Sequence, residues 1–449
     1  MIRKISLFFL GVMMFSLQIK AQETRGLTLT EAIRLGVENS KNLKRTQNSL
    51  DKATASVDEA KDRKLPDLKL SGQYMRMAKA SFGGPLLESL SGKEAGDGSS
   101  GGGGGVSPNQ VLLGMANASI PVFSGNRINN GIQAAKYLEK AASFDVEDQK
   151  EAVIENTIEA YYNLYKAQSY VTLVKENLKT SEQRVKDFSN LEKNGIIPRN
   201  DLLSAQLQQK NMELAVLEAE NNQKIANYNF DLMIGLDENT TLELQSPDFN
   251  TSLLPLQDLE TDALQSRNDV QSLDNRLHAA EYATKVTKGA YWPSVVVSGM
   301  YAALDVHKVL TAKNLMNAGV ALSYNLSDLY KTKSKVRQSI AQEKDVQIAQ
   351  SELTDQIKMQ VHKAYQDYLE SIKRIDVLQN AIELANENYR IVKNKHDNSL
   401  ATATELLDAD ASKLQANVNY EFAKVDSRIA YNKLLLASGL ITKTYMNNK

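Results

Sequence analysis

The chain has 449 residues and is almost neutral, with 53 Lys and Arg against 54 Asp and Glu. This balance lacks the basic surface that nucleic acid attracts, so no nucleic-acid partner is expected. The absence of cysteine excludes disulfide frameworks, cysteine-ligated zinc, iron–sulfur clusters and thiol catalysis.

The first predicted element is a secretory signal peptide over residues 1–21. Arg3 and Lys4 precede an apolar run from Ile5 to Ile19, and the small residue Ala21 follows. A membrane anchor is the alternative, but the run is shorter than the ~20 residues that a spanning helix needs. The rest of the chain contains no apolar run of that length, so an exported chain is expected to be soluble or to cross a membrane as β-strands.

Residues 22–254 are interpreted as one structural repeat, in the order helix, strand, loop, strand, long helix and return helix. The opening helix is expected to begin at Thr28 or Thr30 and to end near Lys64, because Pro66 follows. The later elements are expected to be a strand over 66–77, a flexible glycine-rich loop over 81–108, a strand over 112–122, a long helix over 124–193 and a return helix that ends near 233.

Residues 255–449 repeat this order. The segment 66–74 recurs at 293–301, and the pairs Ala160-Tyr161, Leu202-Leu203 and Gly235-Leu236 recur as Ala364-Tyr365, Leu406-Leu407 and Gly439-Leu440. The second copy is expected to contain a long helix over 327–395, a turn over 398–401 and a return helix that ends near 438. The sequence therefore predicts two tandem structural repeats, mainly α-helical with some β-structure.

The predicted strands alternate between apolar and polar residues and are about ten residues long, the length of a tilted membrane-crossing strand. The apolar face is expected to contact lipid, although the alternation is equally consistent with an antiparallel sheet on a soluble helical body. A sheet in lipid must close on itself, and the four strands of one chain are too few, whereas two chains supply eight and three supply twelve. The candidate lipid-facing and interfacial-belt residues are Leu68, Leu70, Tyr74, Trp292, Val295, Val297, Tyr301, Val320, Leu322 and Tyr324.

The duplicated order and the junctions between its elements resemble the TolC-type outer-membrane efflux channels. The segments that carry the resemblance are the opening helix 29–33, the helix-to-strand junctions 65–68 and 292–295, the strand-to-helix junction 121–127 and the second turn 398–409. The resemblance implies a homotrimer with a twelve-stranded transmembrane β-barrel in the outer membrane of a Gram-negative bacterium. A long α-helical barrel would continue it across the periplasm.

The resemblance also implies a passive export duct, which docks through its helical tips onto a periplasmic adaptor protein and an inner-membrane pump. The alternative is a soluble periplasmic coiled-coil scaffold or adaptor. Ile196, Ile197 and Leu400 are expected to be exposed, which would be unusual on a tip without a partner. The candidate docking residues are Gly195, Ile196, Ile197, Ser399, Leu400 and Ala401.

No catalytic, cofactor-binding or metal-binding constellation is expected, because phosphate-binding loops are missing and the four histidines lack ligand spacing. Glu405 and Asp408 share one helix face, which in itself is typical of a solvated surface. The resemblance implies that carboxylates at these positions ring the entrance constriction. It also implies that Asp201 and His396 form a link that holds the entrance closed, while Ala401 replaces an arginine of a second such link.

Overall fold

The computed structural model describes residues 24–76, 110–238, 240–246, 255–307 and 310–446. The predicted signal peptide over 1–21 and the glycine-rich loop over 81–108 lie outside these ranges. The chain divides into two compact units, and each draws on both halves of the sequence. The sheet unit comprises Leu50–Ala142 and Leu273–Ala349, and the helical unit comprises Met1–Ser49, Ser143–Ser272 and Gln350–Lys449.

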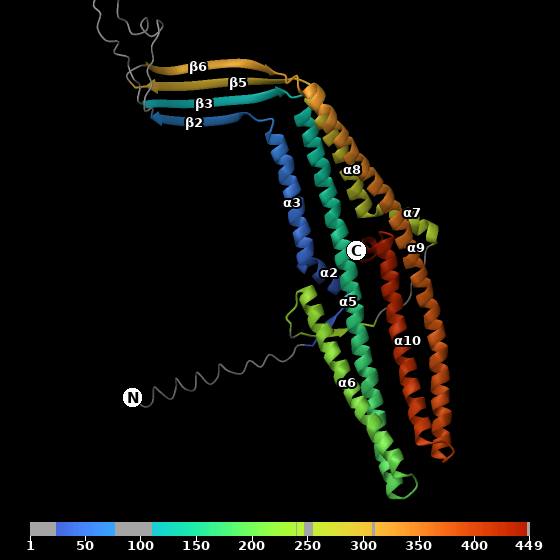
Figure 1. Ribbon diagram of the computed structural model, residues 1–449. Helices are drawn as coiled ribbons and strands as arrows, with labels where there is room; N and C mark the ends of the chain where they lie inside the picture. Colours follow the sequence, from blue (N-terminus) through green and yellow to red (C-terminus); the bar gives the residue numbers. More distant parts are fainter. Residues whose placement is uncertain (1–23, 77–109, 239, 247–254, 308–309, 447–449) are drawn as a thin grey trace, which may run out of the picture. The chain divides into compact units, whose positions relative to one another are not determined.

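The sheet unit is built around a four-stranded antiparallel sheet in the order β2-β3-β5-β6 (Figure 1). The register pairs Leu70 with Ala116, Ala116 with Tyr301, and Tyr301 with Met316. The predicted strands are therefore confirmed, although β3 extends slightly further than the expected 112–122 and β2 is slightly shorter than the expected 66–77. Their bounds are Asp67–Arg76 for β2, Gln110–Phe123 for β3, Ser294–Val306 for β5 and Leu310–Ser323 for β6.

Close backbone contact marks one strand-to-helix junction of the sheet unit. Gly125 has φ +62°, and a Cβ atom there would collide with the carbonyl oxygen of Gly289. Gly289 begins a short 3₁₀ turn, η1 (Gly289–Tyr291), which precedes β5. The turn at Gly125 delays the start of α5 (Arg127–Lys193) by three residues relative to the expected start at residue 124.

Two long helical hairpins form most of the helical unit (Figure 1). The first joins α5 to α6 (Arg199–Ile234), and the second joins α9 (Asp328–Asp397) to α10 (Ala403–Ala437). The 67 residues of α5 correspond to a rod of ~100 Å. Both hairpins were expected from the helical spacing of apolar residues, and the turns lie where the sequence predicts them.

The opening helix of each half is broken, which the sequence did not predict. The first half has α2 (Leu29–Asn39) and α3 (Lys41–Asp62), and the second has α7 (Leu256–Ser266) and α8 (Asn268–Lys288). At the first break, Ser40 leaves the helical conformation with ψ 116°, and its hydroxyl accepts a hydrogen bond from the Leu43 N–H at 3.2 Å. A helix N-cap therefore forms in the middle of the expected helix.

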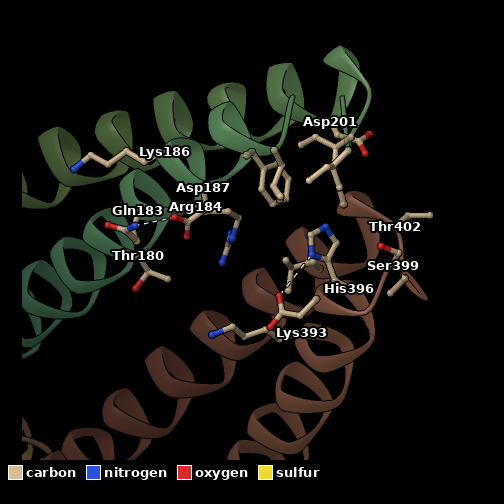
Figure 2. A pocket seen from close by; sticks show the side chains of 18 of the residues that line it. Thr180, Gln183, Arg184, Lys186, Asp187, Asp201, Lys393, His396, Ser399 and Thr402 are labelled. Atoms are coloured by element: carbon tan, nitrogen blue, oxygen red, sulfur yellow. Dashed lines mark hydrogen bonds and ion pairs between the residues drawn. The ribbon is translucent and has the colours of Figure 1, made fainter. Parts of the chain in front are cut away.

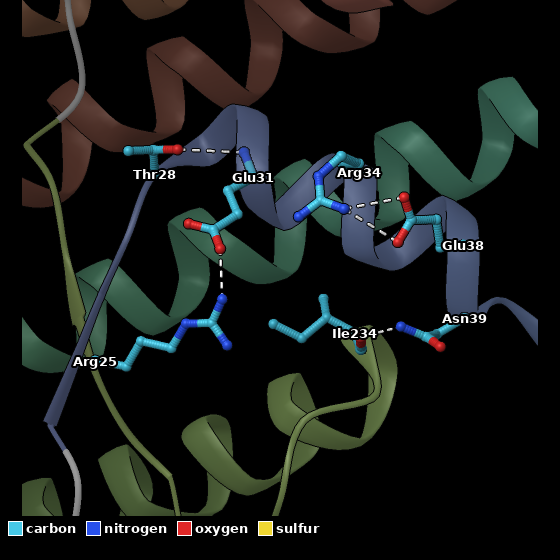
Figure 3. A network of polar contacts seen from close by, with 7 residues as sticks. All are labelled: Arg25, Thr28, Glu31, Arg34, Glu38, Asn39 and Ile234. Atoms are coloured by element: carbon cyan, nitrogen blue, oxygen red, sulfur yellow. Dashed lines mark hydrogen bonds and ion pairs between the residues drawn. The ribbon is translucent and has the colours of Figure 1, made fainter.

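Polar contacts fix α2 at both ends (Figure 3). The Thr28 hydroxyl accepts from the Glu31 N–H at 3.2 Å, and the Glu31 carboxylate pairs with Arg25. At the other end, Asn39 donates to the carbonyl oxygen of Ile234 at 2.9 Å. This last bond attaches α2 to the C-terminus of α6, where Gly235 adopts φ +77°.

Three further elements complete the helical unit, and the sequence did not predict them. They are β1 (Thr24–Leu27), β4 (Thr241–Leu244) and α11 (Ile441–Met446), and β1 and β4 pair in parallel. The Tyr161 hydroxyl accepts from the Gln245 N–H at 3.1 Å and donates to the Leu27 carbonyl at 3.2 Å. One buried tyrosine of α5 thus joins both strands to the main core, which also contains Phe230 and Ile234.

Candidate functional site

The first candidate site is one face of the four-stranded sheet. Residues directly opposite each other in antiparallel strands point to the same face, and the register places the predicted apolar positions together. Leu70 is 86% exposed and Val320 is 71% exposed. The apolar face consists of Leu68, Leu70, Tyr74, Val295, Val297, Tyr301, Met316, Val320 and Leu322, with Leu112, Ala116 and Ala118 between them.

The opposite face of the sheet is more polar. Its polar side chains are Lys69, Ser71, Gln73, Asn117, Ser119, Ser298 and Asn317, and they alternate with apolar ones, namely Leu113, Met115, Met300, Leu304 and Leu315. Large side chains that are exposed and apolar on one face, with polar groups on the other, are the reverse of a sheet that covers a protein core. This arrangement suits a sheet whose apolar face contacts a non-aqueous medium.

Two aromatic residues flank this sheet without belonging to its strands. Trp292 caps the η1 turn ahead of β5, and its side chain is exposed. Tyr324 follows the end of β6 and is also exposed. Both lie where a strand meets a helix, the position expected for aromatic residues at a membrane–water interface.

The second candidate site consists of the two hairpin tips in the helical unit. Gly195 and Ser399 both adopt positive φ, at 71° and 58°, and this lets the chain reverse between helices. The following residues, Ile196 and Leu400, are 61% and 77% exposed. Each turn therefore carries one apolar side chain into solvent, directly after a left-handed residue.

Ile197 differs from the expectation that it would be exposed. It is partly buried and packs against a cluster formed by Phe188, Leu202, Ala205, Ala403 and Leu406, which we call the tip cluster. Residues of α5, α6 and α10 contribute to the tip cluster, so the cluster includes residues of both hairpins. Within the candidate docking set, Ile196 and Leu400 are the exposed large apolar members.

Glu405 has a local structural role in addition to its predicted place at the entrance. Thr402 caps α10 by accepting from the Glu405 N–H at 3.2 Å, and the Glu405 carboxylate accepts from the Thr402 N–H at 2.7 Å. This reciprocal pair is a capping box, which the spacing Thr402-x-x-Glu405 could have indicated. The Thr402 N–H, and then the Thr402 hydroxyl, hold the pKa of Glu405 below its ordinary value. Asp408, one turn further along, is exposed.

Asp201 and His396 line the same pocket of about 870 Å³ at the tips, but each has its own contacts (Figure 2). His396 stacks on Phe188 with ring centroids 5.2 Å apart and an interplanar angle of 12°. Its Nδ1 atom lies 3.9 Å from Asp397, while Asp201 accepts from the Asn200 side chain at 3.1 Å. Within the described part of this single chain, no hydrogen bond or ion pair joins Asp201 to His396, so their link remains a prediction.

A buried ion pair at this pocket was not identified from the sequence. Arg184 of α5 and Asp410 of α10 lie 3.0 Å apart, and both side chains are only 7% exposed. Charges on long helices usually mark solvated faces, so neither residue was singled out. Their pairing connects two segments that are far apart in the sequence, and no local spacing indicates it.

Two features are absent from the part of the chain that the structure describes. In the described ranges, no group of three or more His, Cys, Asp or Glu residues is arranged to hold a metal ion. The described helices also include none that is long and apolar enough to cross a membrane.

Comparison with known proteins identifies the family and the fold. A sequence model of the outer membrane efflux protein family matches residues 32–236 and 259–440. Curated proteins give no match. The structure is similar to the outer-membrane channel OprN, with 17% identity, a TM-score of 0.76 and coverage of 92% of this chain and 89% of that chain. It is also similar to the CmeC outer membrane channel of Campylobacter jejuni, with 17% identity, a TM-score of 0.77 and coverage of 92% of this chain and 86% of that chain. A third similar structure is VceC of Vibrio cholerae, with 15% identity, a TM-score of 0.74 and coverage of 92% of this chain and 96% of that chain. At these identities, the solved structures establish a shared fold.

Proposed function

The chain belongs to the outer membrane efflux protein family, and from this premise we propose that three copies form a continuous export duct that docks onto an adaptor and a pump. It is an outer-membrane protein of a Gram-negative bacterium that serves export and is not an enzyme. Family membership favours this function over the soluble periplasmic scaffold that the sequence had left open.

The exposed apolar face of the sheet is the observation that carries the proposal. Strands β2 and β6 are the two edges of the sheet in one chain. Backbone groups at such edges find no water in lipid, so the sheet has to close. We propose that β6 of one copy pairs with β2 of the next. Three copies of the four-stranded sheet then give a twelve-stranded barrel with a lumen.

Exposed apolar residues on the long helices support the trimer. They lie along α6 and α9, whose other faces pack within the chain, and a neighbouring copy would cover them. The proposed arrangement is a helical barrel that continues from the sheet and extends into the periplasm. The residues concerned are Leu203, Leu207, Leu214 and Leu217 on α6 and Val377, Leu384 and Ile391 on α9.

The hairpin tips are the proposed docking surface for a periplasmic adaptor protein, which would connect the duct to an inner-membrane pump. Exposed Ile196 and Leu400 support this role, because water is a poor environment for them at a tip without a partner. Gly195 and Ser399 set the direction of the two turns. Ile197 and Ala401 lie beside these turns and complete the proposed surface.

The entrance of the duct is proposed to be lined by Glu405 and Asp408, one pair from each copy. Rings of carboxylates select cations in narrow pores. Because Glu405 also caps α10, Asp408→Asn is the cleaner test of the ring, and it should lower the cation preference measured from reversal potentials. Asp201 and His396 are proposed to form their closing link in the assembled trimer.

The predicted tandem organisation, with a signal peptide over 1–21 and repeats over 22–254 and 255–449, is retained as part of the proposal. A similar contact occurs once in each half. Asn39 donates to the carbonyl of Ile234, directly before left-handed Gly235, and Arg267 donates to the carbonyl of Ala437 at 3.0 Å, two residues before left-handed Gly439. A shared origin of the two halves would account for this recurrence.

Reconstitution of the purified full chain in a planar bilayer tests the proposed function. We expect a detergent-dependent trimer that inserts and carries current. A chain that stays in solution without detergent and carries no current would overturn the duct. It would instead fit the soluble periplasmic coiled-coil scaffold.

A further inference from the structure

Four exposed basic side chains gather at the start of α9, a few residues after the end of β6. They are Lys331, Lys333, Lys335 and Arg337, and we call them the basic cluster. None of the four forms an ion pair or a side-chain hydrogen bond with another residue that the structure describes. Their positive charges are therefore available to a partner outside the described chain.

The end of α8 adds to this charge. The Thr284 hydroxyl of α8 lies 3.1 Å from the Ser339 hydroxyl of α9, so the two helices are in contact close to the sheet (Figure 1). The last turn of α8, residues 285–288, carries two exposed lysines. Together, this turn and residues 328–337 of α9 hold six basic residues and one acidic residue, Asp328. This corner of the sheet unit is thus strongly positive.

Large apolar side chains lie directly beside the basic cluster. Leu326 and Tyr330 are 68% and 67% exposed, and Leu329 between them is also exposed. Trp292 and Tyr324 are exposed at the same end of the sheet. A phospholipid offers both matching groups, a charged headgroup and an acyl chain next to it. A soluble polyanion would pair with the charges but would leave these apolar side chains in water.

Other junctions of the same sheet provide an internal comparison. Helix α5 also follows a strand, but its first seven residues, 127–133, include one basic residue. That residue, Arg127, donates to the Ser124 carbonyl oxygen at 3.0 Å. Near the end of α3, Lys61 and Arg63 each pair with an acidic residue one turn earlier. The excess of unpaired basic side chains is therefore particular to the corner formed by α8 and α9.

We propose that the basic cluster binds the phosphate groups of anionic phospholipids, in the membrane leaflet on the side of the helices. The inference rests on the proposed function, which places the sheet in lipid. Measured from the first residue of α9, Lys331 lies ~5 Å and Arg337 ~14 Å along the helix. The headgroup region is roughly 5–8 Å deep on each side of a bilayer, and charges act beyond it over a Debye length of about 8 Å.

These lengths divide the work within the basic cluster. Lys331 and Lys333 are close enough to contact phosphates directly, because long basic side chains can extend back towards the headgroups. Lys335 and Arg337 lie within a Debye length of the surface and add to the attraction. Three copies of the basic cluster around the barrel would fix the height of the duct in the membrane.

Native mass spectrometry of the purified full chain tests the lipid contact. The probe is an equimolar mixture of dioleoyl-phosphatidylglycerol and dioleoyl-phosphatidylcholine in a neutral detergent. The wild type is expected to retain mainly the anionic lipid, and higher salt should weaken this preference. Glutamine at all four positions of the basic cluster should lower the ratio of anionic to neutral bound lipid by roughly tenfold or more. Arginine at the three lysine positions should preserve the ratio, because it keeps the charge.

The same helix supplies a matched control further from the sheet. Lys358, Lys363, Lys373 and Arg374 are exposed, and replacing them by glutamine removes the same total charge. This variant should keep the lipid ratio within about twofold of the wild type. An equal loss in both glutamine variants, or a wild type that does not distinguish the two lipids, would overturn the proposal.

Soluble phosphates separate a lipid surface from a site for small anions. Inorganic phosphate or glycerol 1-phosphate, at the concentration of the lipid, should not displace bound phosphatidylglycerol, because neither has an acyl chain. Displacement by either would overturn the lipid assignment. Bilayer currents report separately on the duct. A wild type that carries current without a lipid preference loses only the lipid contact, and one that prefers the anionic lipid without carrying current loses only the duct.

Discussion

The sheet unit and the helical unit place large apolar side chains in opposite environments. In the helical unit, Tyr161 and Phe230 are at most 2% exposed and lie among helices and the small parallel sheet. In the sheet unit, Leu70 and Leu322 point away from the protein. The same preference of apolar groups for non-aqueous surroundings explains both, provided that protein surrounds the first pair and lipid the second. Burial within one chain is therefore not a sufficient guide to which residues this fold depends on.

The largest expected effect comes from the helical core. Phe230→Ala should lower the free energy of unfolding by about 3–5 kcal/mol, because it removes a buried ring that contacts Tyr161. Leu70→Ala is the matched change on the sheet and should have little effect in detergent, since that side chain packs against no core. Thermal unfolding followed by the helical circular dichroism signal measures both. Equal losses for the two variants would contradict the comparison.

Introducing a charged side chain should have different effects on the two faces of the sheet. Val297→Lys should cost ~2–4 kcal/mol if the position lies near the middle of the bilayer. Ser298→Lys, on the other face of the same strand, should cost much less. The yield of heat-resistant trimer in membranes measures both substitutions. If the trimer tolerates them equally, the apolar face does not contact lipid.

A buried carboxyl group makes the helical unit sensitive to pH. Burial, and then the charge of Asp237, raise the pKa of Asp231 from 3.8 to about 6. Between these values, the folded chain binds a proton that the unfolded chain has released, so stability falls as the pH rises through this range and the contribution is lost above it. Asp231→Asn should therefore stabilise the protein at neutral pH by roughly 1–3 kcal/mol. Unfolding at pH 5 and 7.5 tests this, and an unchanged pH dependence in the variant would exclude Asp231 as the source.

The smallest effect on stability is expected at the tips. Ile196→Asp and Leu400→Asp should each change the free energy of unfolding by less than about 0.5 kcal/mol, because both side chains are exposed. Export in cells should nevertheless be lost, since a charge would disrupt an apolar docking contact. Thr404→Asp, also exposed near a tip, is the control and should leave export intact. Continued export by both tip variants would refute the docking role.

Local signals predicted much of the fold. The end of α5 at Lys193 agrees with the sequence because Asn194, Gly195 and Pro198 all disfavour helix there. The break at Ser40 was missed because the apolar spacing continues through it. Next to the break, Asn39 donates a hydrogen bond to the end of α6, which is far away in the sequence. Neither β1 nor β4 could be inferred, since a four-residue strand has little propensity of its own and gains stability from a distant partner.

The candidate sites show the same division between local and distant information. The alternation of the strands was enough to place Val297, Tyr301 and Leu322 on one face, because side-chain direction in a strand has a fixed period. Ile197 packs against a cluster that includes residues of both hairpins, and Arg184 pairs with Asp410 across them. A single sequence carries no local trace of that contact.

The parallel pairing of β1 with β4 sets an order of events during folding. Thr24 pairs with Thr241, so a strand close to the start of the described chain has no partner until both helices of the first hairpin have been made. Contacts between such distant segments form slowly, since a long loop must close before they stabilise anything. The N-terminal end of an exported chain emerges first, so β1 has no partner strand during this time. Its unpaired backbone groups could then pair with other chains. Protection of this short segment by a chaperone in the periplasm would matter most before residue 241 has emerged.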